Sequence, residues 1–124
     1  ILHKGHVLHL KNSKKFGELL IVGVLTDKAI MEKKAKPTMS FDERMFLVSE
    51  LKCVDMAIPQ ETYSPLSNVK SLRPDVLMES ESHDAKEVSR IRSIVSEMGV
   101  KTITMPYYPE QSSSRIKECI RKEV

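Results

Sequence analysis

Two histidines near the start of the chain are spaced so that both could hold one small anion. The segment HKGH places His3 and His6 three positions apart, with Gly5 directly before the second imidazole. At a helix start, glycine lets a ligand approach the backbone, and the unpaired N–H groups of the first turn attract anions. Two imidazoles beside those donors would form a phosphate pocket. A pair of structural side chains with backbone partners is the simpler alternative.

A metal site is a third interpretation of the histidine pair, and the sequence offers it little support. A structural zinc site usually needs four ligands with recognisable Cys and His spacing. The remaining candidates are isolated, namely His9, His83, Cys53 and Cys119. We therefore expect no metal ion held by protein ligands at this pair.

A lysine-rich segment follows an apolar stretch that ends in polar residues. The stretch LLIVGVL runs into Thr26 and Asp27, and Lys34 and Lys36 precede Pro37. Taken alone, such a run of lysines is usually a solvated surface. After a strand, the same loop could close over a polyphosphate, with each ammonium acting as a point charge on the reacting oxygens. The position of the lysines after the strand favours this second interpretation.

Arg44 lies within the segment SFDERM, inside a helix that we expect to begin after Ser40. Ser40 and Glu43 form a capping-box pattern, which predicts that helix start. Arg44 could belong to an exposed ion pair on the helix surface or bind an anionic ligand. Both interpretations stay open from the residue types alone.

Three consecutive hydroxyl groups stand near the end of the chain. Ser112, Ser113 and Ser114 precede RIKECI, whose pattern predicts a helix. Serine at a helix start is most often an N-cap. The neighbouring Arg115 and Lys117 also suit a second phosphate site, and two helix starts facing one site would imply a polyphosphate.

The apolar pattern predicts helices that alternate with strands. We expect a helix from about Gly5 to Gly17, a strand within 18–27 that is covered on both faces, a helical turn in 28–39, a helix after Ser40, a strand at 54–58, a short helix at 65–72, a strand at 75–80, a helix at 84–99, a strand at 100–106 and a helix from Ser112. This order predicts an α/β fold with a parallel sheet and helices on both faces. Ligands of such sheets bind at the carboxyl ends of the strands. The candidate residues should therefore converge on one edge.

Length and composition predict one folded domain spanning residues 1–124. Hydrophobic residues are 40% and charged residues 30% of the chain, which excludes a disordered protein. The net charge of +3 mildly favours anionic ligands. Tryptophan is absent and aromatic residues are only 5%, which argues against nucleic acid as a partner.

The chain lacks the patterns of membrane and secreted proteins. Its longest apolar run, around residues 19–25, is far shorter than the roughly 20 residues of a spanning helix. No secretory signal is visible. Cys53 and Cys119 show no paired spacing, which fits a reducing compartment. We expect a cytoplasmic location and no membrane contact.

Four stretches in this order resemble the H-x-G-H nucleotidyltransferase superfamily over essentially the whole chain. They are ILHKGHVLHLKNSKKFGELLIVGVLTD, KAKPTMSFDERMFLVSELKCVD, LRPDVLMES and SSSRIKECI. The pattern is similar to glycerol-3-phosphate cytidylyltransferase, to the sugar-phosphate adenylyltransferase domain of heptose (lipopolysaccharide core) biosynthesis, and to archaeal FAD synthase. The resemblance implies a Rossmann-like fold.

The resemblance also implies an activity and residue roles. A nucleoside monophosphate would pass from ATP or CTP to a phosphorylated small-molecule acceptor, releasing pyrophosphate in the presence of a divalent cation such as Mg²⁺. His3 and His6 would stabilise charge in the transition state together with Lys34 or Lys36, the mobile lysine. The nucleotide would also contact Gly5, Asp27, Arg44, Glu79, Ser112, Ser113 and Ser114. A sugar phosphate is the favoured acceptor, and a homodimer is an expected state because dimers are common in the family.

Three departures from the family pattern qualify these expectations. Family members carry a strand and a Gly-x-Phe-Asp segment before the first histidine, so we expect that Ile1 is not the native start and that the first central strand is missing from this sequence. No arginine precedes the serine turn, which favours ATP over CTP. MESESHD replaces the usual Gly-x-Asp, which leaves the role of Glu79 and of the loop to Asp84 open.

Overall fold

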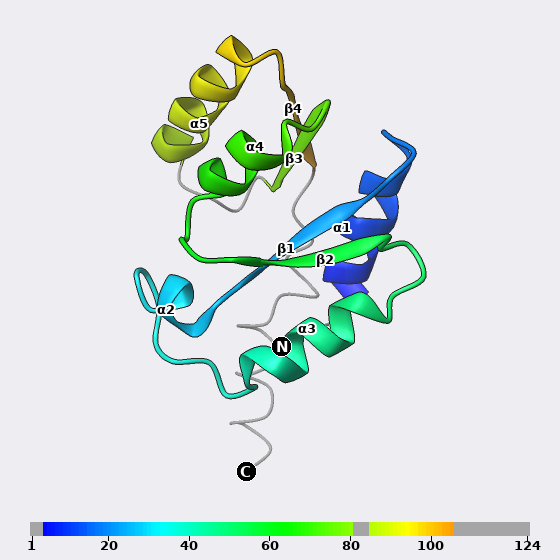
Figure 1. Ribbon diagram of the computed structural model, residues 1–124, viewed down its shortest axis with the longest axis vertical. Coiled ribbons are helices and arrows are strands. Elements are labelled where there is room, and N and C mark those ends of the chain that lie inside the picture. The colour runs from blue at the N-terminus through cyan, green and yellow to red at the C-terminus, as the bar shows by residue number, and fades with distance from the viewer. Residues whose placement is uncertain (1–3, 81–84, 106–124) are drawn as a thin grey trace.

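Strands and helices alternate along the chain, as the apolar pattern predicts. The computed structural model describes residues 4–80 and 85–105. Its elements are α1 (Lys4–Lys14), β1 (Ile21–Leu25), α2 (Asp27–Ile30), α3 (Phe41–Ser49), β2 (Met56–Gln60), α4 (Leu66–Leu72), β3 (Val76–Ser80), α5 (Ala85–Glu97) and β4 (Lys101–Met105). All the strand pairs are parallel. The α/β class with parallel strands is therefore confirmed (Figure 1).

The strands form two separate parallel pairs. Strand β1 pairs with β2, with Ile21 opposite Met56, and β3 pairs with β4, with Val76 opposite Lys101. Within the described ranges, no ladder joins one pair to the other. The single sheet that we predicted is thus present as two halves.

Helices cover the strand pairs from different sides. Helix α3 packs against β1 and β2, whereas α5 packs against β4 and α4 contacts α5 (Figure 1). The buried core beneath α4 and α5 contains Val69, Ile91, Val95 and Val100, with Leu77 of β3 packed against it. This core fixes β3 and β4, while α3 fixes the ends of β1 and β2.

Two of the predicted strands differ from the observed ones. Strand β1 is shorter than the segment 18–27, and the expected coverage on both faces is wrong, because Val24 alone is buried in this strand while Ile21 and Gly23 are exposed. Strand β2 begins later than predicted, because the N–H groups of both Asp55 and Met56 donate to Leu20 O before the ladder starts. It extends through Pro59, which a strand paired on one side tolerates.

Asp55 connects the first helix to both central strands. Its Oδ2 accepts hydrogen bonds from Lys14 Nζ at 2.5 Å and from Leu20 N at 2.7 Å. The hydrogen bond from Lys14 is the main reason that the pKa of Asp55 lies below its ordinary value, and the Leu20 N–H lowers it further. This contact holds the end of α1 beside the start of β1, so the chain reverses direction there.

The end of α5 agrees with the glycine that predicted it. Gly99 has a φ of 81°, a left-handed conformation that glycine adopts without strain. The N–H of Val100 donates to Val95 O and the N–H of Gly99 donates to Ser96 O, which satisfies carbonyl groups at the helix end. The chain then turns directly into β4.

Gly23 provides space at the centre of β1. A Cβ atom at this position would lie 2.6 Å from Gln60 Oε1 and 3.5 Å from Asn68 Nδ2. Gln60 is held there because its Nε2 donates to Thr62 O and Tyr63 O, at 3.1 and 3.0 Å. The missing side chain therefore lets Gln60 lie across β1 and connect β2 to the segment before α4.

Glu79 is a buried carboxylate near the end of β3. It is 8% exposed and stands opposite Thr104 of β4, whose Oγ1 accepts a hydrogen bond from Arg92 of α5. Burial raises the pKa of Glu79 above its ordinary value, and the positive charge of Arg92 opposes that rise only in part. Ionisation of Glu79 is therefore costlier in the folded protein than in the unfolded chain.

We predict that Gly23→Ala destabilises the fold by about 1 to 2 kcal/mol, because the new methyl group displaces Gln60 from its two carbonyl partners. Gly17→Ala is the matched control, since the nearest atom to its Cβ is Leu19 O at 3.8 Å. Urea unfolding of both variants measures the difference. Equal stability of the two variants would contradict this account of Gly23.

We predict that Glu79→Gln increases the free energy of unfolding at neutral pH and leaves it almost unchanged below about pH 4. The folded-state pKa of Glu79 is raised because ionising the buried carboxyl costs free energy. This ionisation penalty is absent when the carboxyl is protonated in both the folded and the unfolded state. The penalty grows as pH rises from the unfolded-state pKa through the folded-state pKa. Urea unfolding at several pH values measures this dependence. A stability difference that does not vary with pH would refute the burial argument.

Candidate functional site

The carboxyl end of β1 is held by short hydrogen bonds on both sides. The N–H of Thr26 donates to Gln60 O at 3.0 Å, which continues the contact between β1 and β2 beyond the ladder. Thr26 Oγ1 accepts from the N–H of Ala29 at 3.2 Å and caps α2. Asp27 is therefore fixed as the first residue of α2, at the edge where ligands of parallel sheets bind.

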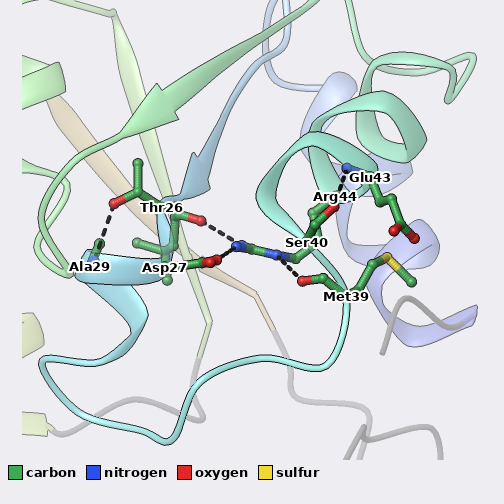
Figure 2. Close-up of polar contacts among 8 residues, drawn as sticks. Thr26, Asp27, Ala29, Met39, Ser40, Glu43 and Arg44 are labelled. Carbon is green, nitrogen blue, oxygen red and sulfur yellow. Dashed lines mark hydrogen bonds and ion pairs between the residues drawn. The ribbon is translucent and has the colours of Figure 1, made fainter.

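Arg44 of α3 reaches the same edge and contacts Asp27 directly. Its Nη2 lies 2.5 Å from Asp27 Oδ1, and its Nη1 donates to Leu25 O. Its Nε donates to Met39 O at 3.2 Å, and the guanidinium carbon lies 5.7 Å from the centre of the Phe41 ring. Figure 2 shows this side chain between the end of β1 and the start of α3. Asp27 and Arg44, predicted from separate motifs, thus form one unit.

The start of α3 explains how Arg44 reaches β1. Ser40 Oγ accepts from the N–H of Glu43 at 3.2 Å, which confirms the predicted cap (Figure 2). The N–H of Arg44 donates to Ser40 O at 3.0 Å, so Arg44 lies in the first turn of a fixed helix. Its long side chain then spans the distance to the strand.

Lys34 and Lys36 lie in the segment that joins α2 to α3, and both are exposed. The N–H of Lys34 donates to Ile30 O at 2.8 Å, so Lys34 directly follows the last turn of α2. Glu32 Oε2 accepts from the N–H of Tyr63 at 3.0 Å, which ties the same turn to the chain beyond β2. The predicted lysine loop is therefore present beside Asp27, with its two ammonium groups directed to solvent.

The described part of the histidine motif lies in the first turn of α1. Gly5 is buried and His6 is exposed. Because the chain reverses between α1 and β1, the start of α1 lies at the same end of this pair as the carboxyl end of β1 (Figure 1). His6 therefore lies in the first turn of α1, and Asp27 begins α2 after the end of β1. His3 lies outside the described residues.

The other candidate residues divide into one buried residue and three that the structure does not describe. Glu79 lies at the carboxyl end of β3, where the sequence predicted a ligand contact, but it is buried under α5 rather than open. Ser112, Ser113 and Ser114 lie outside the described residues. Their nucleotide contacts stay predictions.

Sequence reasoning missed the backbone acceptors at this edge. Leu25 O and Met39 O bind Arg44, and Thr62 O and Tyr63 O bind Gln60. Every residue has a backbone carbonyl, so the residue type does not show which carbonyl will accept a hydrogen bond. Only the expected end of the strand after Leu25 could have indicated that Leu25 O lacks a ladder partner. The polar residue Gln60 at the end of an apolar strand was the available signal for the other pair.

Two further properties concern metal and membrane. Among residues 4–80 and 85–105, no three His, Cys, Asp or Glu side chains are grouped closely enough to hold a metal ion. No helix in those ranges is both long and apolar enough to span a bilayer. What the edge after β1 does offer is exposed positive charge from Lys34 and Lys36, which suits a phosphate-containing ligand.

Comparison with known proteins gives several relatives named bifunctional protein HldE. The chain is 34% identical over 124 residues to the bifunctional protein HldE of Helicobacter pylori strain P12, covering 98% of this chain and 26% of that protein. It is 35% identical to HldE of Helicobacter acinonychis strain Sheeba, with the same coverage. HldE of Sulfurimonas denitrificans is 34% identical over 90 residues. The chain thus spans about a quarter of the length of the curated relatives it matches first.

A solved structure and a family model agree with this comparison. The crystal structure of the lipopolysaccharide core biosynthesis protein from Thermoplasma volcanium matches with a TM-score of 0.74 and 30% identity, over 87% of this chain and 88% of that one. The family model described as cytidylyltransferase-like matches residues 1–119. On this match over nearly its whole length, the chain belongs to the cytidylyltransferase-like family.

Proposed function

We propose that this chain transfers a nucleoside monophosphate from a nucleoside triphosphate to a phosphorylated small molecule and releases pyrophosphate. Family membership supports the reaction type. The observation that carries the proposal is the edge after β1, where the Asp27–Arg44 pair stands beside the exposed lysine loop. This edge combines fixed backbone with exposed positive charge, as a triphosphate site requires.

The chain's own residues act by position and charge. A phosphate oxygen of the acceptor attacks the α-phosphorus of the nucleotide, and the bond to pyrophosphate breaks on the opposite side. His6 donates a hydrogen bond to the oxygens around that phosphorus, where negative charge develops. Lys34 and Lys36 place positive charge on the leaving pyrophosphate. No covalent intermediate with the protein is needed.

A divalent cation fits this site as a companion of the nucleotide. Mg²⁺ in phosphate-transfer sites is held largely by phosphate oxygens and water, with one or two carboxylates from the protein. Asp27 is 39% exposed at its side chain, and Arg44 contacts only its Oδ1. Asp27 Oδ2 is therefore the carboxylate oxygen that we assign to such a cation, which would neutralise charge on the phosphates when bound.

The substrates follow from the relatives and from the serine turn. We propose ATP rather than CTP, because the segment 107–111 directly before Ser112 contains no arginine. We propose a sugar phosphate as acceptor, in line with the lipopolysaccharide core biosynthesis protein that this chain resembles. Both substrates are small cytoplasmic metabolites, which is consistent with the cytoplasmic location and the absence of a nucleic-acid partner that the sequence predicted. The homodimer stays a prediction.

A pyrophosphate-release assay tests the proposed reaction. Purified protein is incubated with Mg²⁺, either ATP or CTP, and one acceptor among a sugar phosphate, glycerol 3-phosphate and FMN. We expect release with ATP and the sugar phosphate and little release with the other pairs. Saturable ATP binding without pyrophosphate release for any pair would identify a nucleotide-binding module instead of an enzyme.

We predict that His6→Ala lowers kcat by about 100-fold or more, because it removes one preorganised donor from the transition state. His9→Ala is the matched control, since it removes the same side chain one turn further along α1. Steady-state kinetics on both variants, after circular dichroism has shown that they fold, measures the effect. Equal losses in the two variants would assign the effect to helix α1 rather than to His6.

A further inference from the structure

The lysine loop has its two ends fastened by a single side chain. Leu25 stands before the loop and Met39 stands after it, and their carbonyl groups accept hydrogen bonds from Nη1 and Nε of Arg44. Between these carbonyls, Nη2 binds Asp27, the first residue after the strand end. The guanidinium therefore closes the segment 26–39 into a loop (Figure 2).

This engagement uses three of the five N–H donors of Arg44, one on each nitrogen. All three nitrogens of the guanidinium donate to the chain itself, and the side chain is only 17% exposed. The ring of Phe41 lies beside the guanidinium. Bidentate recognition of a phosphate needs two parallel N–H groups on one open side of the fork. The geometry thus leaves Arg44 poorly placed for direct contact with a nucleotide.

We propose that Arg44 is a positioning residue: it holds both ends of the lysine loop and so determines where Lys34 and Lys36 stand relative to the phosphates. The role of the lysines rests on the proposed function, whereas the loop closure itself does not. The sequence analysis expected Arg44 as a nucleotide ligand, and this proposal replaces direct contact with action through the loop.

Loop closure matters because the lysines must be near the nucleotide yet able to move. Fixing the ends of a loop restricts the conformations of its middle, which raises the effective concentration of its side chains at one place. The turn 30–34 adds a second fastening, through Glu32 and the N–H of Tyr63. The loop is thus fastened at its start, at the turn 30–34 and at Met39.

Trypsin cleavage of the ligand-free protein tests loop closure without reference to activity. The variants are Arg44→Lys, which cannot match the planar fork, and Asp27→Asn, which removes the charge of its partner. Arg90→Lys is the control, because Arg90 forms an exposed ion pair with Glu87 on α5. None of these substitutions adds or removes a trypsin site between residues 28 and 40. The rate of cleavage after Lys33 and Lys34 can therefore be compared between variants by mass spectrometry.

We expect cleavage after Lys33 and Lys34 to be about 10-fold faster in Arg44→Lys and in Asp27→Asn, and unchanged in Arg90→Lys. Unchanged cleavage in both loop variants would overturn the proposal. If Arg44→Lys fails to fold, Asp27→Asn decides the question alone, since asparagine keeps the shape of aspartate.

Kinetics separates positioning from direct binding, provided that the wild type turns over. If Arg44 acts through the loop, Arg44→Lys lowers kcat about 10-fold or more, and adding Arg44→Lys to Asp27→Asn causes little further loss. If Arg44 binds phosphate directly, Arg44→Lys mainly raises KM for the nucleotide, its loss persists in the Asp27→Asn background, and the proposal is wrong. If cleavage is faster in the loop variants but the wild type never releases pyrophosphate, loop closure by Arg44 is supported and the proposed function is wrong.

Discussion

The contact between the Arg44 guanidinium and the end of β1 is the constraint on which the described edge depends. Three elements meet there: the last carbonyl of β1, the first residue of α2 and the first turn of α3. A strand end leaves carbonyl groups without ladder partners, and a buried carbonyl without a partner costs free energy. The planar fork binds the strand-end carbonyl of Leu25, the loop carbonyl of Met39 and a carboxylate through three separate nitrogens, whereas an ammonium carries all its donors on one nitrogen.

The same edge shows how the fold keeps charge close to solvent. Arg44 and Asp27 are partly exposed, so their desolvation costs less than that of a fully buried ion pair. Glu79 is the contrasting case, because its side chain is nearly fully buried and the positive charge of Arg92 offsets the cost of ionising it only in part. Burial of this carboxylate therefore lowers the stability of the fold at neutral pH.

Much of the fold could be predicted from the sequence, because the signals were local. Ser40 before α3, Gly99 after α5 and the apolar runs around Val24 and Leu77 each act within a few residues. The start of β2 could not be predicted in this way, because it depends on Leu20 O, which accepts from a segment far along the chain. The split of the strands into two pairs could not be predicted either, because apolar periodicity shows where strands lie in the sequence but not which strands pair with each other.

The candidate site was likewise predictable where the sequence signal was local and unpredictable where it depended on contacts between distant segments. Residue types placed Asp27, Arg44 and the lysines at one edge, because strand ends and helix starts meet there in parallel sheets. Residue types could not tell whether Arg44 faces a ligand or the chain, since the partners that decide this are two carbonyl groups. The guanidinium of Arg44 is bound by the chain, whereas Lys34 and Lys36 on the adjoining loop are exposed. The hydrogen-bond partners of a cation, which its residue type does not specify, therefore decide whether it holds the chain together or stays open to solvent.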